Sequence, residues 1–201
     1  TEKDLIEALR VMNQLPNLDI PCALVYPSDY EPEITQLKQT ALMLQHCKKP
    51  IYTPGISAPS NVKYIVKLFK LIGGEDVAHN PIGMTAVAAD SPLCLAKNIT
   101  DCTRMLVEAG IPTALHAAPM AGLTGPLSVA GTVAQSHAEV LAFACVAYLF
   151  NPECVLIHGA RPFFVNMKSA QNLLGLPETG IGSSLASQLA CHIGMMTDVY
   201  G

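Results

Sequence analysis

The chain has 201 residues, half of them hydrophobic and only 14% charged, which favours a large buried core in one domain or part of one. Its net charge of −4 and the lack of any basic run argue against a nucleic-acid surface, so no nucleic-acid partner is expected. The longest apolar run, 140–150, is shorter than the ~18 residues that a membrane span needs.

Helical and extended segments alternate along the chain. Residues at helical spacing predict helices over 1–15, 32–45, 62–72, a stretch ending at 109, 127–150, 165–174 and 182–193. Short apolar runs predict strands at 23–26, 50–53, 84–89, 113–118, 155–158 and 196–200. Ser60 is a predicted N-cap of the third helix, and Asn98 or Thr100 of the fourth.

Six strands with helices between them are typical of parallel βα units, and strands that are apolar on both faces suit a parallel sheet. No GxGxxG or Walker pattern supports a nucleotide site. The sequence therefore predicts an α/β fold, a (β/α)8 TIM barrel. Because no initiator Met precedes Thr1 and the chain stops where a strand should enter a loop, we interpret residues 1–201 as an incomplete fragment of a single barrel.

Seven cysteines, an odd number without any C-x-x-C pair, lie mostly in apolar runs. They indicate buried thiols in a reducing compartment rather than disulfides. No His, Cys, Asp or Glu cluster has metal-ligand spacing, so no metal site is expected. The charged start of the chain is unlike a signal peptide, and we expect a cytoplasmic protein without membrane contact.

The most informative stretch is 119–126 (PMAGLTGP), a loop between a predicted strand and the longest helix. Gly lets the backbone approach a ligand closely, and Pro stiffens the loop before anything binds. Loops of this kind present ligand sites at the carboxyl edge of a sheet, although a tight βα turn without a ligand is the alternative.

If the strands line a barrel, residues at their carboxyl ends share one mouth. The expected substrate-binding residues at this mouth are Thr53, Ser91, His116, Met120, Gly122 and Gly159. His158, Glu139 and Tyr200 are the catalytic candidates, with Glu139 as a general base. The alternatives are that His116 and His158 are interior histidines, that Glu139 is satisfied by loop backbone, and that Arg161 lies on the surface instead of binding an anion.

Three stretches, PMAGLTGPLSVAGTVAQSHAEVLAF, NPECVLIHGARPFFVNM and GLPETGIGSSLASQLACHIG, together resemble the trimethylamine methyltransferase family. The family pattern falls on Pro119, Gly122, Thr124, Gly125, Pro126, Ala138, Glu139, Gly159 and Met167, and Ser91-Pro92-Leu93 matches a Ser-Pro-Leu of the family. The resemblance implies a (β/α)8 enzyme of methanogenesis that transfers a methyl group from trimethylamine to the Co(I) corrinoid of a carrier protein.

The resemblance also implies the partners: a small methylated amine, a corrinoid carrier protein and, at full length, further copies of the same chain in a homo-oligomer. No cofactor is expected to bind this chain directly, because the carrier supplies the corrinoid.

Family members that act on trimethylamine carry pyrrolysine, encoded by an in-frame amber codon, at a position near or beyond Gly201. A chain that stops there fits an amber codon read as termination, and a sense codon after Gly201 would refute this hypothesis. Residues 194–198 (GMMTD) replace the family's Gly-rich segment. A quaternary amine of the glycine betaine type therefore stays the alternative substrate. The alternative from a different functional class is a non-catalytic fragment that only docks a corrinoid protein.

Overall fold

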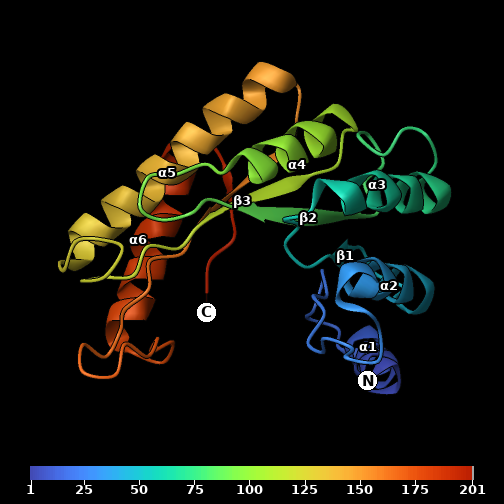
Figure 1. Cartoon of the computed structure of the whole chain (residues 1–201), viewed down its shortest axis with the longest axis horizontal. Coiled ribbons are helices and arrows are strands. Elements are labelled where there is room, and N and C mark those ends of the chain that lie inside the picture. The colour runs from blue at the N-terminus through green and yellow to red at the C-terminus, as the bar shows by residue number, and fades with distance from the viewer. Residues whose placement is uncertain (201) are drawn as a thin grey trace.

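The computed structural model describes residues 1–200 and shows an α/β fold built on one curled, parallel sheet, a half-barrel (Figure 1). The strands are β1 (Ile51–Tyr52), β2 (Gly83–Ala88), β3 (Thr113–Ala117), β4 (Leu156–Ala160) and β5 (Met196–Thr197). The helices are α1 (Glu2–Gln14), α2 (Pro32–His46), α3 (Pro59–Gly73), α4 (Lys97–Glu108), α5 (Val129–Phe150) and α6 (Pro177–His192). The predicted α/β class and parallel sheet are confirmed.

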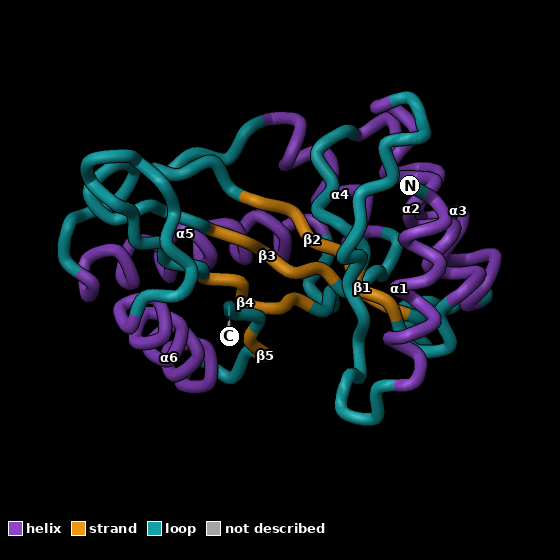
Figure 2. Tube along the Cα trace, turned by 90° about the horizontal axis from the view of Figure 1, so that it is seen from below, coloured by secondary structure: helices purple, strands orange, loops and turns teal. Residues whose placement is uncertain are grey.

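The strands pair in chain order, β1-β2-β3-β4-β5, and a helix joins each strand to the next. All four pairings are parallel. Successive helices pack on one another around the outer side of the sheet, as Figure 1 shows. From below, the strands lie between α1–α3 on one side and α5 and α6 on the other (Figure 2). The carboxyl ends of all five strands therefore lie along one edge.

Local chemistry explains where several helices begin and end. Thr1 and Asp4 form a capping box at the start of α1, and the Ser128 hydroxyl accepts a hydrogen bond from the Gly131 amide at the start of α5. Gly74 ends α3 at a φ of 85°, a conformation that glycine adopts without a steric cost.

The main hydrophobic core lies between the sheet and the helices. On this helix-facing side, strand residues such as Val87, Leu115 and Leu156 pack with Leu106 of α4 and Phe143 of α5. Side chains alternate along a strand, so the intervening residues face the other way. Ala86, Ala114 and Ile157 form a second, smaller cluster with Tyr52 and Met84 on this opposite side, which we call the inner face.

The structure corrects four sequence predictions of local elements. Residues 23–26 form no strand, and only Cys22 makes a bridge, to Tyr52, so the sheet has five strands instead of six among residues 1–200. Residues 165–174 form turns and a short bridge between Val165 and Asn172, not a helix. The N-caps of α3 and α4 are Ala58 and Ala96, without a side-chain hydrogen bond, because these helices begin before the predicted polar caps Ser60, Asn98 and Thr100.

Helix α5 matches the helix predicted over 127–150, and it extends well beyond the apolar run 140–150. Its 22 residues would suffice by length and composition to cross a membrane. In the fold, however, α5 packs against β3, β4, α4 and α6, and Val140, Phe143 and Ala147 are buried there. Its apolar composition is that of a helix covering a sheet.

Candidate functional site

Four polar side chains meet at the carboxyl edge of the inner face, and we call them the inner-face cluster: Tyr52, His116, Arg161 and Asp198. Three donors converge on one oxygen of Asp198. Its Oδ2 lies 2.7 Å from the Tyr52 hydroxyl, 2.9 Å from His116 Nε2 and 2.6 Å from Arg161 Nη2. The Tyr52 hydroxyl also lies 2.7 Å from His116 Nε2. One carboxylate thus joins side chains from β1, β3 and the segment after β4.

Gly159 makes this convergence possible. The register of the sheet sets His116 of β3 opposite Gly159 of β4, and the Asp198 amide donates to the carbonyl of His158 on the other side of β4. A Cβ on Gly159 would lie 2.3 Å from His116 Cδ2 and 2.7 Å from the Leu115 carbonyl oxygen. Because Gly159 carries no side chain, His116 and Asp198 can touch across the strand that separates them.

The surroundings of Asp198 hold its carboxyl group ionised. Burial by itself raises the pKa of this group, but the hydrogen bond from His116, the charge of Arg161 and the hydrogen bond from Tyr52 outweigh burial and lower the pKa to about 2. The Arg161 side chain is 14% exposed and that of Asp198 is 18% exposed. Arg161 and Asp198 therefore form an ion pair that is largely buried but still partly accessible to solvent, and their two charges offset each other.

The other two members of the cluster are neutral at neutral pH. Burial, followed by the charge of Asp198 and the hydrogen bond to it, raises the pKa of Tyr52 far above its usual value. Burial lowers the pKa of His116, and the hydrogen bond to Asp198 only partly opposes this effect. A protonated Tyr52 and a neutral His116 are both able to donate a hydrogen bond.

Tyr200 lies at the outer end of the cluster. Its ring is 4.6 Å from the guanidinium carbon of Arg161 and 5.2 Å, centroid to centroid, from the ring of Phe163. Arg161 Nη1 also donates to the Tyr200 hydroxyl at 3.3 Å. The cation–π contact and the hydrogen bond together orient Arg161 toward Asp198.

A hollow of about 370 Å³ opens on the inner face beside the cluster. Its lining is apolar except at one end, and consists of Ile20, Tyr52, Met84, Ile157, Met196, Thr197, Asp198 and Val199. The hollow has the size of a site for a small organic molecule, with polar groups placed at one end.

His158 faces the other way from His116 and does not share the inner-face site. It is fully buried between β4 and α5, and its Nε2 lies 2.8 Å from Nδ1 of His137. Burial and the neighbouring charge of His137 lower the pKa of His158 to about 4. The expectation that His158 points into the common mouth is therefore not met, because residues 158 and 159 of a strand point to opposite faces.

Thr53 also lies on the helix-facing side. Its side chain is fully buried and donates a hydrogen bond of 2.8 Å to the Thr85 hydroxyl. The residue before it, Tyr52, is the one that faces the hollow. The sequence placed Thr53 correctly at the end of a strand, but its side chain faces the helices and not the inner face.

Ser91 and Glu139 contact each other away from the inner face. The Ser91 hydroxyl donates to Glu139 Oε2 at 2.6 Å, and the Leu93 amide donates to Oε1 at 2.9 Å. Glu139 is only 4% exposed. Neither residue lines the hollow on the inner face.

Met120 and Gly122 shape the loop after β3. The Met120 carbonyl accepts hydrogen bonds from the amides of Leu123, Thr124 and Gly125. Gly122 adopts a φ of 80°, and a Cβ there would come within 2.9 Å of the Met167 sulfur. Both predicted residues thus lie at the carboxyl edge, in a tightly hydrogen-bonded turn.

Of the residues predicted from the sequence, His116 belongs to the inner-face cluster, and Gly159 and Tyr200 adjoin it. Arg161, which the sequence left open between anion binding and the surface, is a member of the cluster. Sequence reasoning did not single out Tyr52 or Asp198. The available signal was the alternation of the strands: counting in steps of two along β4 gives 157, 159 and 161 on one face. The pyrrolysine hypothesis concerns the position that follows Gly201, and Gly201 lies outside the described residues.

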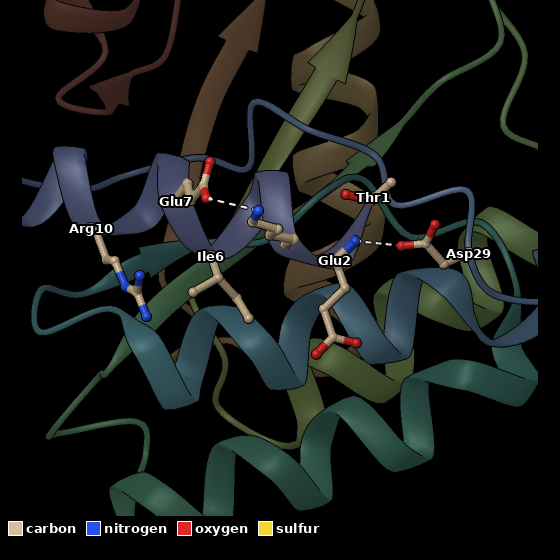
Figure 3. A pocket seen from close by; sticks show the side chains of 7 residues that line it. Thr1, Glu2, Ile6, Glu7, Arg10 and Asp29 are labelled. Atoms are coloured by element: carbon tan, nitrogen blue, oxygen red, sulfur yellow. Dashed lines mark hydrogen bonds and ion pairs between the residues drawn. The ribbon is translucent and has the colours of Figure 1, made fainter.

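A larger hollow, of about 520 Å³, lies elsewhere. It is formed by α1 and Asp29, and its other lining residues are Thr1, Glu2, Lys3, Ile6, Glu7 and Arg10 (Figure 3). Its polar groups are exposed and paired locally, as in the Lys3–Glu7 ion pair. Exposed ion pairs of this kind contribute little stabilising free energy, whereas the polar groups of the inner-face cluster are largely buried. We therefore place the candidate site on the inner face. Within residues 1–200, no group of three or more His, Cys, Asp or Glu side chains is arranged to hold a metal ion.

Comparisons with known proteins agree with the motifs. A trimethylamine methyltransferase of Desulfitobacterium hafniense (strain DSM 10664 / DCB-2) is 23% identical over 203 aligned residues, covering all of this chain and 41% of the relative. A glycine betaine methyltransferase of Desulfitobacterium hafniense (strain Y51) is 32% identical over 126 residues, covering 62% of this chain and 26% of the relative. A trimethylamine methyltransferase of Methanosarcina barkeri is 26% identical over 211 residues, covering all of this chain and 41% of the relative.

The chain thus spans about two fifths or less of the length of these curated relatives. The sequence model described as trimethylamine methyltransferase (MTTB) matches residues 1–199, almost the entire chain. This protein belongs to the trimethylamine methyltransferase family.

Proposed function

We propose that this chain is part of a (β/α)8-barrel methyltransferase that transfers a methyl group from trimethylamine to the Co(I) corrinoid of a separate carrier protein. The observation that carries the proposal is the inner-face cluster, a set of polar side chains beside a small hollow at the carboxyl edge of a parallel sheet. In barrel enzymes the reaction takes place at this edge. Family membership over residues 1–199 supplies the reaction class.

The half-barrel supports the barrel architecture. The five strands run parallel in chain order, which is the connectivity of consecutive βα units. The outer edge of β1, which here bonds only at Tyr52 to the segment 21–22 among the described residues, and the outer edge of β5 would be closed by the further strands of a longer protein. We propose that residues 1–201 belong to a single domain of this kind.

The hollow and the cluster together suit a small methylated amine. Met84, Ile157 and Met196 offer apolar walls for methyl groups, and the Tyr52 hydroxyl offers a donor to nitrogen. In this reaction the corrinoid supplies, as Co(I), the nucleophile that takes the methyl group. The electron pair of the broken C–N bond stays on nitrogen, and a tertiary amine then needs a proton to leave as dimethylamine.

In this proposal the Tyr52 hydroxyl delivers that proton to the departing nitrogen, and the neutral His116, which could give up a proton only by becoming an imidazolate, has a positioning role. Both are neutral, and both are held by hydrogen bonds to Asp198. Arg161 offsets the charge of Asp198, so a tyrosinate left by proton transfer carries the net charge of the cluster, and Tyr52 regains its proton from solvent through the open hollow before the next turnover. General acid catalysis of this type contributes about 10²–10⁴-fold to a rate.

A quaternary amine that carries a carboxylate, such as glycine betaine, is the second candidate substrate. Arg161 favours it, because a guanidinium at the cluster can pair with a substrate carboxylate in a bidentate way. The similarity to a glycine betaine methyltransferase points in the same direction. A quaternary amine leaves as a neutral tertiary amine, so no proton is needed from Tyr52 or His116.

The test is a substrate panel with the full-length protein and a reduced corrinoid carrier, followed by the change in cobalt absorbance. Demethylation of trimethylamine, lost by about 10²-fold or more in Tyr52→Phe, supports the proposal. Turnover of glycine betaine alone, unchanged in Tyr52→Phe, identifies the second candidate. Binding of the carrier without turnover of any amine would show a docking function only.

A further inference from the structure

Two polar residues of α5, Gln135 and Glu139, hold the loops at the carboxyl edge together. They are four residues apart on the helix, so both lie on one side of it. Gln135 Nε2 donates to Glu139 Oε1 and to the Thr124 carbonyl oxygen, both at 2.8 Å. We call Gln135 and Glu139 the α5 brace.

The brace reaches two loops at once. Glu139 accepts from the Ser91 hydroxyl and the Leu93 amide in the loop after β2, whereas Gln135 binds the Thr124 carbonyl in the loop after β3. Within the second loop, the Thr124 hydroxyl accepts from the Met120 amide at 2.9 Å. Two side chains of one helix therefore set the distance between the loops that follow adjacent strands.

A third loop is attached to the second by its backbone. The Ala121 amide donates to the Phe163 carbonyl at 2.8 Å, and the Phe163 amide donates to the Pro119 carbonyl at 2.9 Å. Phe163 in turn packs on Tyr200 next to Arg161. A continuous series of contacts thus runs from Ser91, through the brace, to the inner-face cluster.

Glu139 does not face the hollow on the inner face; it lines a separate one of about 310 Å³ between α5 and the loop after β2. Its side chain is 4% exposed and is absent from the lining of the inner-face hollow. Three neutral donors occupy its two carboxylate oxygens. A carboxylate in this setting is stabilised as an acceptor and acts through the groups that it binds.

We propose that Glu139 is a positioning residue: with Gln135 it fixes the loops after β2 and β3 as the rim of the site on the inner face. The inference rests on the proposed function for its meaning in catalysis, because that function places the site at this edge. Its structural part, the coupling of the two loops through one carboxylate, can be measured without any turnover.

The first experiment compares wild type with Glu139→Gln in the full-length protein by hydrogen exchange. The glutamine keeps the size of the side chain but has one acceptor oxygen, so Leu93 or Ser91 loses its partner. We expect the Leu93 amide to exchange at least tenfold faster. The exposed Cys94 in the same loop should react faster with a thiol reagent, while the exposed Cys145 and Cys191 keep their rates as internal references.

The second experiment measures the steady-state kinetics of the same variants with the carrier and the amine that wild type accepts. A positioning role predicts that KM rises at least fivefold in Glu139→Gln, while the pH profile of kcat keeps both limbs. Ser91→Ala should shift KM in the same direction, and the double variant should show less than the product of the two effects, since both remove one contact. Glu178→Gln, in an exposed position of α6, is the matched control.

Two outcomes would overturn the inference. Unchanged Leu93 exchange and Cys94 reactivity in Glu139→Gln would show that the carboxylate does not hold the loop. A loss of one limb of the kcat profile with an unchanged KM would instead make Glu139 a general base. If Glu139→Gln does not fold, Gln135→Ala replaces it: this variant removes the link to the Thr124 carbonyl, and unchanged exchange of the Leu123, Thr124 and Gly125 amides in it counts against the brace. Because exchange needs no substrate, a wild type without methyl transfer contradicts the proposed function and leaves this test intact.

Discussion

The two faces of the sheet each carry a histidine, and the contrast between them explains how this fold separates packing from chemistry. His116 on the inner face meets Tyr52 and Asp198 beside an open hollow. His158 on the helix-facing side meets only one side-chain partner, His137, and is closed off from solvent. The pKa of both histidines is lowered by burial, so a shifted pKa alone does not distinguish them. The difference lies in the partners and in the access of a ligand.

The contact between His116 and Asp198, which distinguishes the inner face, depends most strongly on Gly159. The substitution Gly159→Ala should therefore have the largest effect. A Cβ would collide with His116 and with the backbone of Leu115, so we expect a loss of about 3 kcal/mol of unfolding free energy, the upper end of the usual cost of overpacking. Methyl transfer should fall at least about 100-fold, because His116 moves away from Asp198. Denaturant unfolding and the cobalt assay measure the two effects.

Gly175→Ala is the control for this substitution, since no atom lies within 4 Å of a Cβ at that position. A normal melting curve and normal turnover in Gly159→Ala would mean that the contact across β4 has no functional value.

Asp198→Asn tests the electrostatic part of the inner face. Removal of the charge leaves Arg161 without its buried partner, which costs up to about 3 kcal/mol in a shielded site. It should also lower the pKa of His116 further, because a charged acceptor for the imidazole is lost. Histidine chemical shifts over a pH titration report the change. The same substitution at the exposed Asp101, paired with Lys97, should leave stability and the His116 titration unaltered.

The helix-facing histidine has a pH signature of its own. The pKa of His158 falls from 6.5 in the unfolded chain to about 4 in the fold, so its stabilising contribution is complete above pH 6.5 and is lost as the pH falls toward 4. Between pH 7 and pH 5 this amounts to about 2 kcal/mol of unfolding free energy. His158→Gln should remove that dependence, and His192→Gln, at an exposed position, should retain it. An identical pH dependence in His158→Gln and wild type would contradict the assignment.

The smallest effect is expected at Thr53, a predicted substrate residue that faces the helices. Thr53→Val keeps the shape and removes one buried hydrogen bond to Thr85, with a cost of about 1 kcal/mol. KM and kcat should stay as in wild type, as in the comparison variant Thr103→Val on α4. A raised KM for the amine in Thr53→Val alone would show that this side of the sheet takes part in binding after all.

Much of this architecture is predictable from local patterns. Apolar runs separated by helices predicted the parallel sheet, and the stretch 119–126 predicted a stiff turn at its carboxyl edge. The strand at 23–26 and the helix at 165–174 were wrong because the pattern of a short segment does not by itself fix its state. Residues 23–26 lie outside the ladder beside β1. Residues 164–173 form turn hydrogen bonds among themselves, such as those from the Asn166 amide to the Gln171 carbonyl and from the Leu173 amide to the Phe164 carbonyl, while Phe163 bonds to the loop after β3.

The sequence by itself determined the family, the class of fold and the sheet edge at which we propose the site, because motifs and hydrophobic periodicity are properties of neighbouring residues. Only the tertiary structure decided which side chains meet. Tyr52 and Asp198 are 146 residues apart, and their contact depends on strand register and on the missing side chain of Gly159. A one-residue step along a strand reverses the face of a side chain, which is why His158 and Thr53 turn toward the core while Gly159 and Tyr52 open onto the hollow.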